Sequence, residues 1–435
     1  MSNRSQSRSG AGARIRQAGP RVAASALLLA PALALAAPAQ AERTPVCLGE
    51  EGATVEEARI AGEVPQEILA RSGFAADVDR FTEELCAASG TDEAGEIVAR
   101  HADALWRKAV DRVRGTGAVE GDLSAGDDRP LYWARLGMTS ALHRWEPGFD
   151  LAGADREALV ADMDRRSRGQ DDAGFAEDPG GPGVSRVVVT GFDPFQLDND
   201  IRQANPSGAA ALALDGAVIE TGDGVAVVEA MLFPVRWRDF TDGMVEHALL
   251  PHYTGDRPAD AVITVSQGRD GRFDLEAHNG AWRGGAADNE SVGTPETAPI
   301  PDGVPTVTPQ PQWSDSSLDH PSIIEETGGA PFPVVDNTQV TEIPAGGTTP
   351  VVRPDGPTPG SEARAGGGGD YLSNEIAYRN TLLRDATGLD IPAGHVHTPI
   401  LYFGPGGGVT DPEFEENRAA IARQVEDIVA AAVRP

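Results

Sequence analysis

Apolar residues in the first third of the chain recur at helical spacing. Three groups show the pattern: Val78, Phe81 and Leu85; then Ile97, Val98, His101, Leu105, Ala109 and Val113; then Leu136, Met138, Leu142 and Trp145. Such spacing is typical of amphipathic helices that pack against a core. It predicts a small helical domain over residues 43–170, in which His101 lies on an apolar face as a core residue.

The pattern changes after a polar segment rich in glycine and proline, residues 171–184, which we interpret as a linker. Short apolar runs rich in β-branched residues then alternate with helical patterns. The predicted strands cover 186–190, 225–235, 261–265 and 396–403, and the predicted helices cover 205–214 and 411–433. This alternation predicts an α/β domain over residues 185–435, layered as α/β/α around a twisted, mostly parallel or mixed sheet.

One segment interrupts this alternation. Residues 296–370 are rich in proline, glycine, threonine and acidic side chains, and they end in the glycine run Gly366–Gly369. A segment with so few apolar side chains cannot build a core of its own. We therefore expect an insertion that is largely loop.

The chain opens with the features of an export signal. Five arginines precede the first acidic residue, Glu42, and an apolar run extends over residues 22–37. The run is short for a membrane span and is followed by Ala39-Gln40-Ala41, a small-x-small pattern that signal peptidase cleaves. We expect residues 1–41 to be a signal peptide and the mature protein to be secreted or to reside in the cell envelope or periplasm.

The net charge of the chain limits the kinds of partner that it can bind. The 435-residue chain has a net charge of −31, and loss of the arginines in residues 1–41 makes the remainder more acidic. An acidic field repels the phosphates of nucleic acids and anionic lipid surfaces. We expect no nucleic-acid partner and no membrane insertion after cleavage.

Two cysteines remain after cleavage, Cys47 and Cys86, both in the predicted helical region. In an oxidising compartment a pair of cysteines predicts one structural disulfide. Two unpaired thiols are the alternative. Neither residue lies near a motif typical of a catalytic thiol.

An ordered set of short motifs begins at the first predicted strand. The set consists of Thr190–Phe195, Asn205-Pro206-Ser207, Phe233-Pro234-Val235, Pro258-Ala259-Asp260, and Asp288-Asn289 with Pro295. Each motif is short, but their order resembles pyroglutamyl peptidase I, also called pyrrolidone carboxyl peptidase. The resemblance covers residues 186–295 and 371–433. It implies a layered α/β fold and a hydrolase that removes N-terminal pyroglutamate from peptides.

The resemblance also implies three catalytic positions. The family uses a cysteine nucleophile, a histidine base and a glutamate that orients the histidine. Residues 371–374, with a tyrosine four positions later, match the nucleophile motif without a gap and put Ser373 at the cysteine position. His397-Thr398-Pro399 resembles the histidine motif. Glu276 follows a Gly-Arg pair at a spacing about two residues shorter than that of the family.

The substrate pocket of the family is lined by aromatic side chains and a glutamine, which here resemble Phe192, Phe195 and Gln267. Aromatic walls with one amide partner suit a compact lactam ring. The implied ligand is a peptide N-terminus or a small lactam or amide. Phe192 and Phe195 as simple packing residues of their loop are the alternative.

We expect no metal and no cofactor. His395 and His397 alternate along a predicted strand, so both rings face one side and could bind zinc with Glu276. No further ligand motif accompanies them. The glycine-rich run 404–408 lacks the Lys-Ser/Thr of a phosphate-binding loop and predicts a turn.

Two functional hypotheses therefore stay open. In the first, the chain is a working hydrolase whose nucleophile is Ser373, activated by a histidine and a carboxylate. In the second, it is a non-catalytic descendant that binds a peptide end or serves as a structural module, because a site shaped for a thiolate need not suit an alcohol.

Overall fold

A computed structural model describes residues 47–171, 174–175, 181, 183–222, 224–329 and 331–433. The expected signal peptide, residues 1–41, lies outside the described residues, as does part of the expected linker. Among the described residues, no helix has the length and apolar character needed to cross a membrane.

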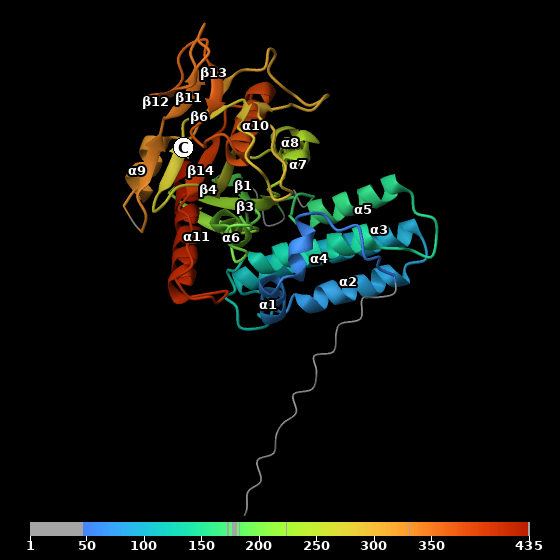
Figure 1. Cartoon of the computed structure of the whole chain (residues 1–435). Coiled ribbons are helices and arrows are strands. Elements are labelled where there is room, and N and C mark those ends of the chain that lie inside the picture. Colours follow the sequence, from blue (N-terminus) through green and yellow to red (C-terminus); the bar gives the residue numbers. More distant parts are fainter. Residues whose placement is uncertain are drawn as a thin grey trace, which may run out of the picture. The chain divides into compact units, whose positions relative to one another are not determined.

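The region expected to be helical contains one 3-10 helix and several α-helices (Figure 1). They are η1 (Glu57–Ala61), α1 (Glu63–Ser72), α2 (Ala75–Ala87), α3 (Thr91–Arg114), α4 (Arg129–Arg144) and α5 (Gly153–Arg166). The apolar stripe of α3 is buried, and His101 packs edge-on against Phe81 with ring centroids 5.4 Å apart. His101 is therefore the core residue that its position on the stripe predicts.

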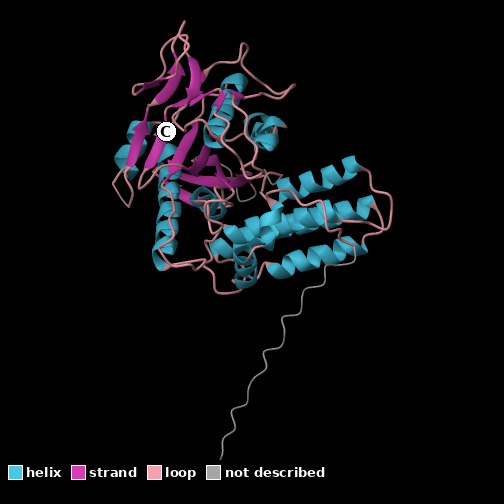
Figure 2. Ribbon diagram, in the orientation of Figure 1, coloured by secondary structure: helices cyan, strands magenta, loops and turns pink. Residues whose placement is uncertain are grey.

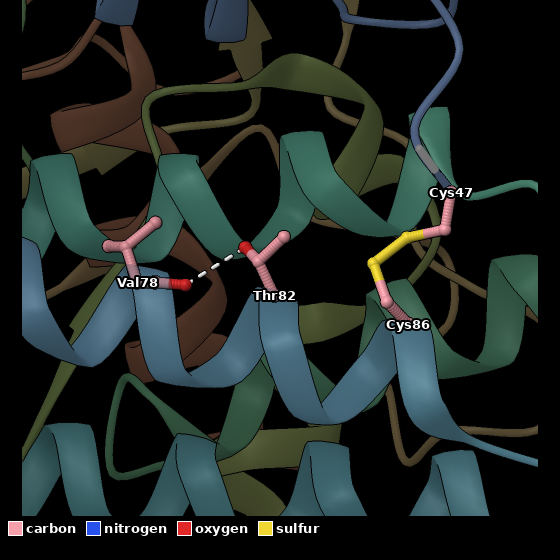
Figure 3. Close-up of a disulfide and its surroundings, with 4 residues drawn as sticks. All are labelled: Cys47, Val78, Thr82 and Cys86. Atoms are coloured by element: carbon pink, nitrogen blue, oxygen red, sulfur yellow. Dashed lines mark hydrogen bonds between the residues drawn. A yellow bond between two sulfur atoms is a disulfide. The ribbon is translucent and has the colours of Figure 1, made fainter. Parts of the chain in front are cut away.

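A disulfide joins Cys47 to Cys86, with the two Cα atoms 5.6 Å apart (Figure 3). Cys86 lies in the last turn of α2, one turn beyond Thr82, which donates a hydrogen bond to the carbonyl of Val78. The bond therefore fastens the segment before η1 to the end of α2. The expected pairing is confirmed.

The central sheet has seven strands in the part of the chain that the structure describes. In spatial order they are β10 (Val334–Asn337), β5 (Phe273–Glu276), β14 (Ala393–Thr398), β4 (Ala261–Gln267), β1 (Val184–Phe192), β3 (Gly224–Phe233) and β2 (Val218–Thr221). The pairs β3–β1, β1–β4, β4–β14 and β5–β10 are parallel, whereas β2–β3 and β5–β14 are antiparallel. The sheet is thus mixed and mainly parallel.

Helices cover both faces of this sheet (Figure 2). Successive residues of a strand point to opposite faces, so Val187 and Val189 enter one core and Val188 enters the other. The first core includes residues of α6 (Pro206–Leu214), α9 (His320–Thr327) and α11 (Pro412–Ala432). The second includes residues of α7 (Trp237–Thr241), α8 (Met244–Thr254) and α10 (Leu372–Thr387). The expected α/β/α layering is confirmed.

Local sequence explains where two of these helices begin. Asn205 accepts a hydrogen bond from the backbone amide of Ser207 at the start of α6. Asp411 accepts one from the amide of Phe414 at the start of α11. Each cap is followed by a proline at the first helical position, which has no amide hydrogen that would need a partner.

Most of the segment 296–370 is loop, as expected, but it also contains several short regular elements that the sequence did not predict. Besides α9 and β10, the segment contains β8 (Glu296–Thr297), β9 (Trp313–Asp315), β11 (Val340–Ile343), β12 (Val351–Arg353) and β13 (Glu362–Ala365). β8 and β9 pair with β7 (Trp282–Arg283) and β6 (His278–Gly280), and β10 joins the central sheet. The segment needs no core of its own because Ile323 and Val334 enter the core that the rest of the chain builds.

The helical region and the sheet belong to one compact unit, which includes all described residues. Buried ion pairs connect them: Asp193, at the end of β1, accepts hydrogen bonds from Arg135 of α4 at 2.8 Å and from Arg168 at 2.8 Å. All three side chains are excluded from solvent. Burial, together with the neighbouring Arg168, lowers the pKa of Arg135 to about 10.

Removal of the disulfide should lower stability. In the chain-entropy model, opening a loop of about 40 residues costs about 4 kcal/mol, less any structure retained in the unfolded chain. We expect the double variant Cys47→Ser/Cys86→Ser to unfold at a clearly lower guanidinium concentration than the wild type. Wild-type protein unfolded under reducing conditions should match the variant. Equal midpoints for oxidised wild type and the variant would contradict the prediction.

Removal of the charge at Asp193 should destabilise the fold strongly. Asp193→Asn leaves Arg135 buried without its carboxylate partner, whereas Arg168 keeps Asp164. Breaking one partner of a buried pair typically costs about 3–5 kcal/mol. The matched control is Asp122→Asn, which removes an exposed partner of Arg71 and should barely move the urea midpoint. Similar midpoints for the two variants would show that the buried pair contributes little.

Candidate active site

His397 and Glu276 come together because their strands, β14 and β5, pair side by side in the sheet. In the antiparallel pairing of β14 with β5, His395 lies opposite Glu276 and His397 lies opposite Asp274. Glu276 is therefore the diagonal neighbour of His397 across the two strands, and Nδ1 of His397 lies 2.6 Å from Oε1 of Glu276. Glu276 is excluded from solvent and His397 is 5% exposed. In the tautomer that carries its hydrogen on Nδ1, the imidazole donates to the carboxylate and keeps Nε2 as an acceptor.

The second oxygen of Glu276 is held by the segment expected to be loop. Asn337, the last residue of β10, donates from Nδ2 to Oε2 of Glu276 at 2.6 Å and to the carbonyl of Gly367 at 3.0 Å. Gly367 belongs to a tight turn in which the backbones of Gly366 and Gly369 hydrogen-bond to each other in both directions. A side chain at Gly367 would collide with Glu276, because a Cβ there would lie 2.1 Å from Oε2.

Ser373 lies in the first turn of α10, directly after the glycine turn. Its hydroxyl donates to the carbonyl of Gly368 at 3.1 Å. Gly368 also touches the histidine, since a Cβ at this position would lie 3.1 Å from Cε1 of His397. The turn therefore binds the Ser373 hydroxyl and lies close to the His397 ring.

Ser373 and His397 both line a cavity of about 530 Å³. Its other walls come from the loop 195–199, the segments 267–269 and 286–289, the glycine turn, Tyr371, and Arg59 of η1. Arg59 is fixed by Asp198, at 3.0 Å, and by the carbonyl of Asn289, at 2.6 Å. The helical region thus supplies one wall of the cavity.

A narrow second cavity of about 30 Å³ adjoins the first, and both are lined by Phe195, Gln267, Tyr371 and Ser373. Phe192 lines the narrow cavity only, and its ring lies against Phe233 and Phe240 with centroids 6.3 and 6.2 Å away. Gln267 ends β4 and accepts a hydrogen bond from the amide of Leu401 at 3.4 Å. The structure therefore brings all six residues singled out by sequence to one end of the sheet.

His395 is fully buried among polar side chains next to His397. Its two ring nitrogens lie 2.8 and 2.9 Å from the hydroxyls of Thr264 and Ser266, and the two histidine rings meet edge to face at 4.7 Å. Burial, and then the proximity of His397, lowers the pKa of His395 well below its usual value. Both nitrogens of His395 are thus engaged by hydroxyls.

No group of three or more His, Cys, Asp or Glu side chains could hold a metal ion among the residues that the structure describes. A second buried carboxylate, Asp274, lies opposite His397 in the strand pairing. Burial, with the charge of Glu276 adding to it, raises the pKa of Asp274. Nε of Arg272 lies 2.9 Å from Asp274 and opposes this shift.

The loop that follows Phe192 and carries Phe195 is held from several sides. Asn205 donates to the carbonyl of Asp193 at 2.9 Å, and Asn289 donates to the carbonyl of Pro194 at 2.9 Å. Asn289 also donates to Glu56, a fully buried residue that precedes η1, at 2.8 Å. Burial raises the pKa of Glu56.

Sequence reasoning missed Asn337, Arg59 and Glu56. The glycine run Gly366–Gly369 was a visible signal, because consecutive glycines permit a backbone to pass against other groups without clashes. No local sequence pattern pointed to Asn337, because its hydrogen-bond partners are distant in sequence.

Several solved structures are similar to this chain. A mutant pyrrolidone carboxyl peptidase from Pyrococcus furiosus is 20% identical, with a TM-score of 0.37, over 57% of this chain and 98% of that chain. Pyroglutamyl peptidase I from Bacillus amyloliquefaciens is 18% identical, with a TM-score of 0.38, over 58% of this chain and 96% of that chain.

Two family models match the sequence. The PA0049 N-terminal domain matches residues 36–164, and the PA0049 C-terminal domain matches residues 186–320 and 316–402. The uncharacterized protein PA0049 of Pseudomonas aeruginosa is 35% identical over 84% of this chain and 83% of its own length. The chain therefore belongs to the PA0049 family.

Proposed function

We propose that the protein is a hydrolase of the pyroglutamyl peptidase type that removes N-terminal pyroglutamate or cleaves a related amide. Ser373 is the nucleophile, His397 the general base and Glu276 the residue that orients the base. The observation that carries the proposal is the 2.6 Å contact between His397 and Glu276 at a cavity that Ser373 also lines. These are the positions at which the sequence motifs resemble the catalytic residues of pyroglutamyl peptidase I.

In the proposed reaction, the Ser373 hydroxyl leaves the Gly368 carbonyl and turns to Nε2 of His397. Its oxygen bonds to the carbonyl carbon of the scissile amide while its proton passes to His397. The carbon–nitrogen bond then breaks, and the same proton goes to the departing amine. Water, deprotonated by His397, hydrolyses the serine ester and restores the hydroxyl. Glu276 keeps the ring in the required tautomer and stabilises the imidazolium.

The start of α10 supports this assignment of the nucleophile. The first backbone amides of a helix have no partner within the helix, and they point toward its N-terminal end. Ser373 lies in that first turn. These amides would stabilise the oxyanion that forms beside the serine during attack.

The narrow cavity is the proposed site of the acyl group. Phe192 and Phe195 offer aromatic contact, and Gln267 offers one amide partner for a lactam. The larger cavity would then receive the leaving group, which is a peptide or amine. Both assignments rest on the chemistry of the lining side chains.

We also propose that the protein acts outside the cytoplasm. The basic and apolar segments before Ala41 have the pattern of a cleaved export signal. The Cys47–Cys86 disulfide is consistent with an oxidising compartment.

A non-catalytic binding role is the second candidate. The observation that favours it is the hydrogen bond from Ser373 to the Gly368 carbonyl, which directs the hydroxyl away from the base. In that case the protein would bind pyroglutamyl peptides without turnover.

Hydrolysis of a pyroglutamyl arylamide separates the two roles. We expect the wild type to release the arylamine, and Ser373→Ala and His397→Gln to lose at least about 10³-fold in kcat, as removal of a triad member does in other hydrolases. Ser89→Ala, at an exposed serine hydrogen-bonded to Glu93 in the helical region, is the matched control and should retain full activity.

Sensitivity to a cysteine-alkylating reagent gives a second test of the nucleophile. The wild type should resist iodoacetamide, because both of its cysteines are joined in the disulfide. A variant Ser373→Cys should become sensitive to it. Turnover that survives in Ser373→Ala would refute the mechanism, and saturable peptide binding without turnover in the wild type would favour the binding role.

A further inference from the structure

Asn337 occupies a position that links the two halves of the candidate active site. It is 6% exposed, and in the parallel pairing of β10 with β5 it lies directly beside Glu276. Its side-chain nitrogen carries two hydrogens: one goes to Oε2 of Glu276 and the other to the carbonyl of Gly367. The amide thus connects the carboxylate that holds His397 to the turn that holds Ser373.

The orientation of this amide is determined by its surroundings. Both groups that face Nδ2 are acceptors, a carboxylate oxygen and a carbonyl oxygen. Rotating the amide by 180° would point Oδ1 at both of them and lose both hydrogen bonds. In the observed orientation, Oδ1 faces the backbone amide of Gln339 at 3.4 Å.

We propose that Asn337 is a positioning residue for the hydrolytic reaction, fixing Glu276 relative to the turn Gly366–Gly369; this inference rests on the proposed function. His397 takes one oxygen of Glu276 and Asn337 takes the other, so the carboxylate cannot rotate. The adjoining Gly368 receives the Ser373 hydroxyl. One side chain therefore sets the geometry between the base and the nucleophile without touching the substrate.

This assignment gives the segment 296–370 a role. β10 is the part of that segment that enters the central sheet, and Asn337 is its last residue. The segment lies between the two stretches that resemble pyroglutamyl peptidase I, so the motifs of that family do not include Asn337. The positioning group is thus a feature of this chain that its resemblance does not supply.

Two variants test the proposal. Asn337→Leu keeps the size of the side chain and removes both hydrogen bonds, and Asn337→Asp keeps the shape but can donate at most one proton where the amide donates two. We expect each to lower kcat for the pyroglutamyl arylamide by about 10- to 100-fold, the effect of losing one hydrogen bond to a charged group. KM should change less than about twofold, since Asn337 lines neither cavity described above.

A pH profile distinguishes positioning from a general loss of structure. The charged and titratable groups around His397 are Glu276 and Asp274 of β5, His395 of β14, and Arg269 and Arg272 of the loop between β4 and β5. Because two adjacent buried carboxyls do not readily ionise together, Asn337→Asp adds its negative charge only as the pH rises, and that charge then stabilises the protonated imidazole. The acidic limb of the kcat/KM profile should therefore move upward by about one pH unit in Asn337→Asp.

Gln339→Asp is the matched control. It adds the same charge two residues further on, at an exposed position where solvent screens it. Its kcat and its acidic limb should equal those of the wild type. Far-ultraviolet circular dichroism and thermal melts establish that all three variants are folded.

The His397 ring can also be followed without turnover, by NMR titration assigned with His397→Gln. Asn337→Asp should shift this titration upward as well. If the wild type does not hydrolyse the arylamide, the proposed function fails while the titration still tests Asn337. Folded Asn337 variants whose NMR titration equals that of the wild type, with unchanged kcat wherever turnover is measurable, would overturn the inference.

Discussion

The antiparallel pairing of β5 with β14 is the constraint on which the candidate site depends. It places Asp274 and Glu276 beside His395 and His397 on one face of the sheet. Because side chains alternate between faces, a slip of one residue would turn every one of these groups to the opposite face. Each of these two strands also has a parallel neighbour that adds a polar residue. Ser266 of β4 lies beside His397, and Asn337 of β10 lies beside Glu276. A single register therefore brings His397, Glu276 and Asn337 together.

Buried charged side chains connect the helical region to the candidate site. Asp193 and Glu56 are excluded from water, and each is surrounded by donors from distant parts of the chain. Buried carboxylates tolerate few geometries, since a lost partner leaves an uncompensated charge. The loop that follows Phe192 and carries Phe195 is consequently fixed by side chains of α4 and of the segment before η1. Arg59 extends the same region into the wall of the larger cavity.

The segment 296–370 shows how a chain can fold without the composition of a core. Its strands are short, and its buried residues Ile323 and Val334 join a core formed by other elements. The segment contributes polar groups to the candidate site, namely the side-chain amide of Asn337 and the backbone of the glycine turn beside Glu276. The apolar content of a segment does not reveal such a polar contribution.

The sequence by itself determined the elements and much of the site. Periodicity located the helices α2, α3 and α4 and the strands β1, β3 and β4, because burial of one face or both imposes a repeat along the chain. Caps at Asn205 and Asp411 marked two helix starts, since a cap depends only on neighbouring residues. The motifs also singled out Ser373, His397 and Glu276, which the structure gathers at one end of the sheet. Only the tertiary structure decided how Asn337, Asp193 and Glu56 contribute, because their partners lie tens to hundreds of residues away and no local pattern records such a contact.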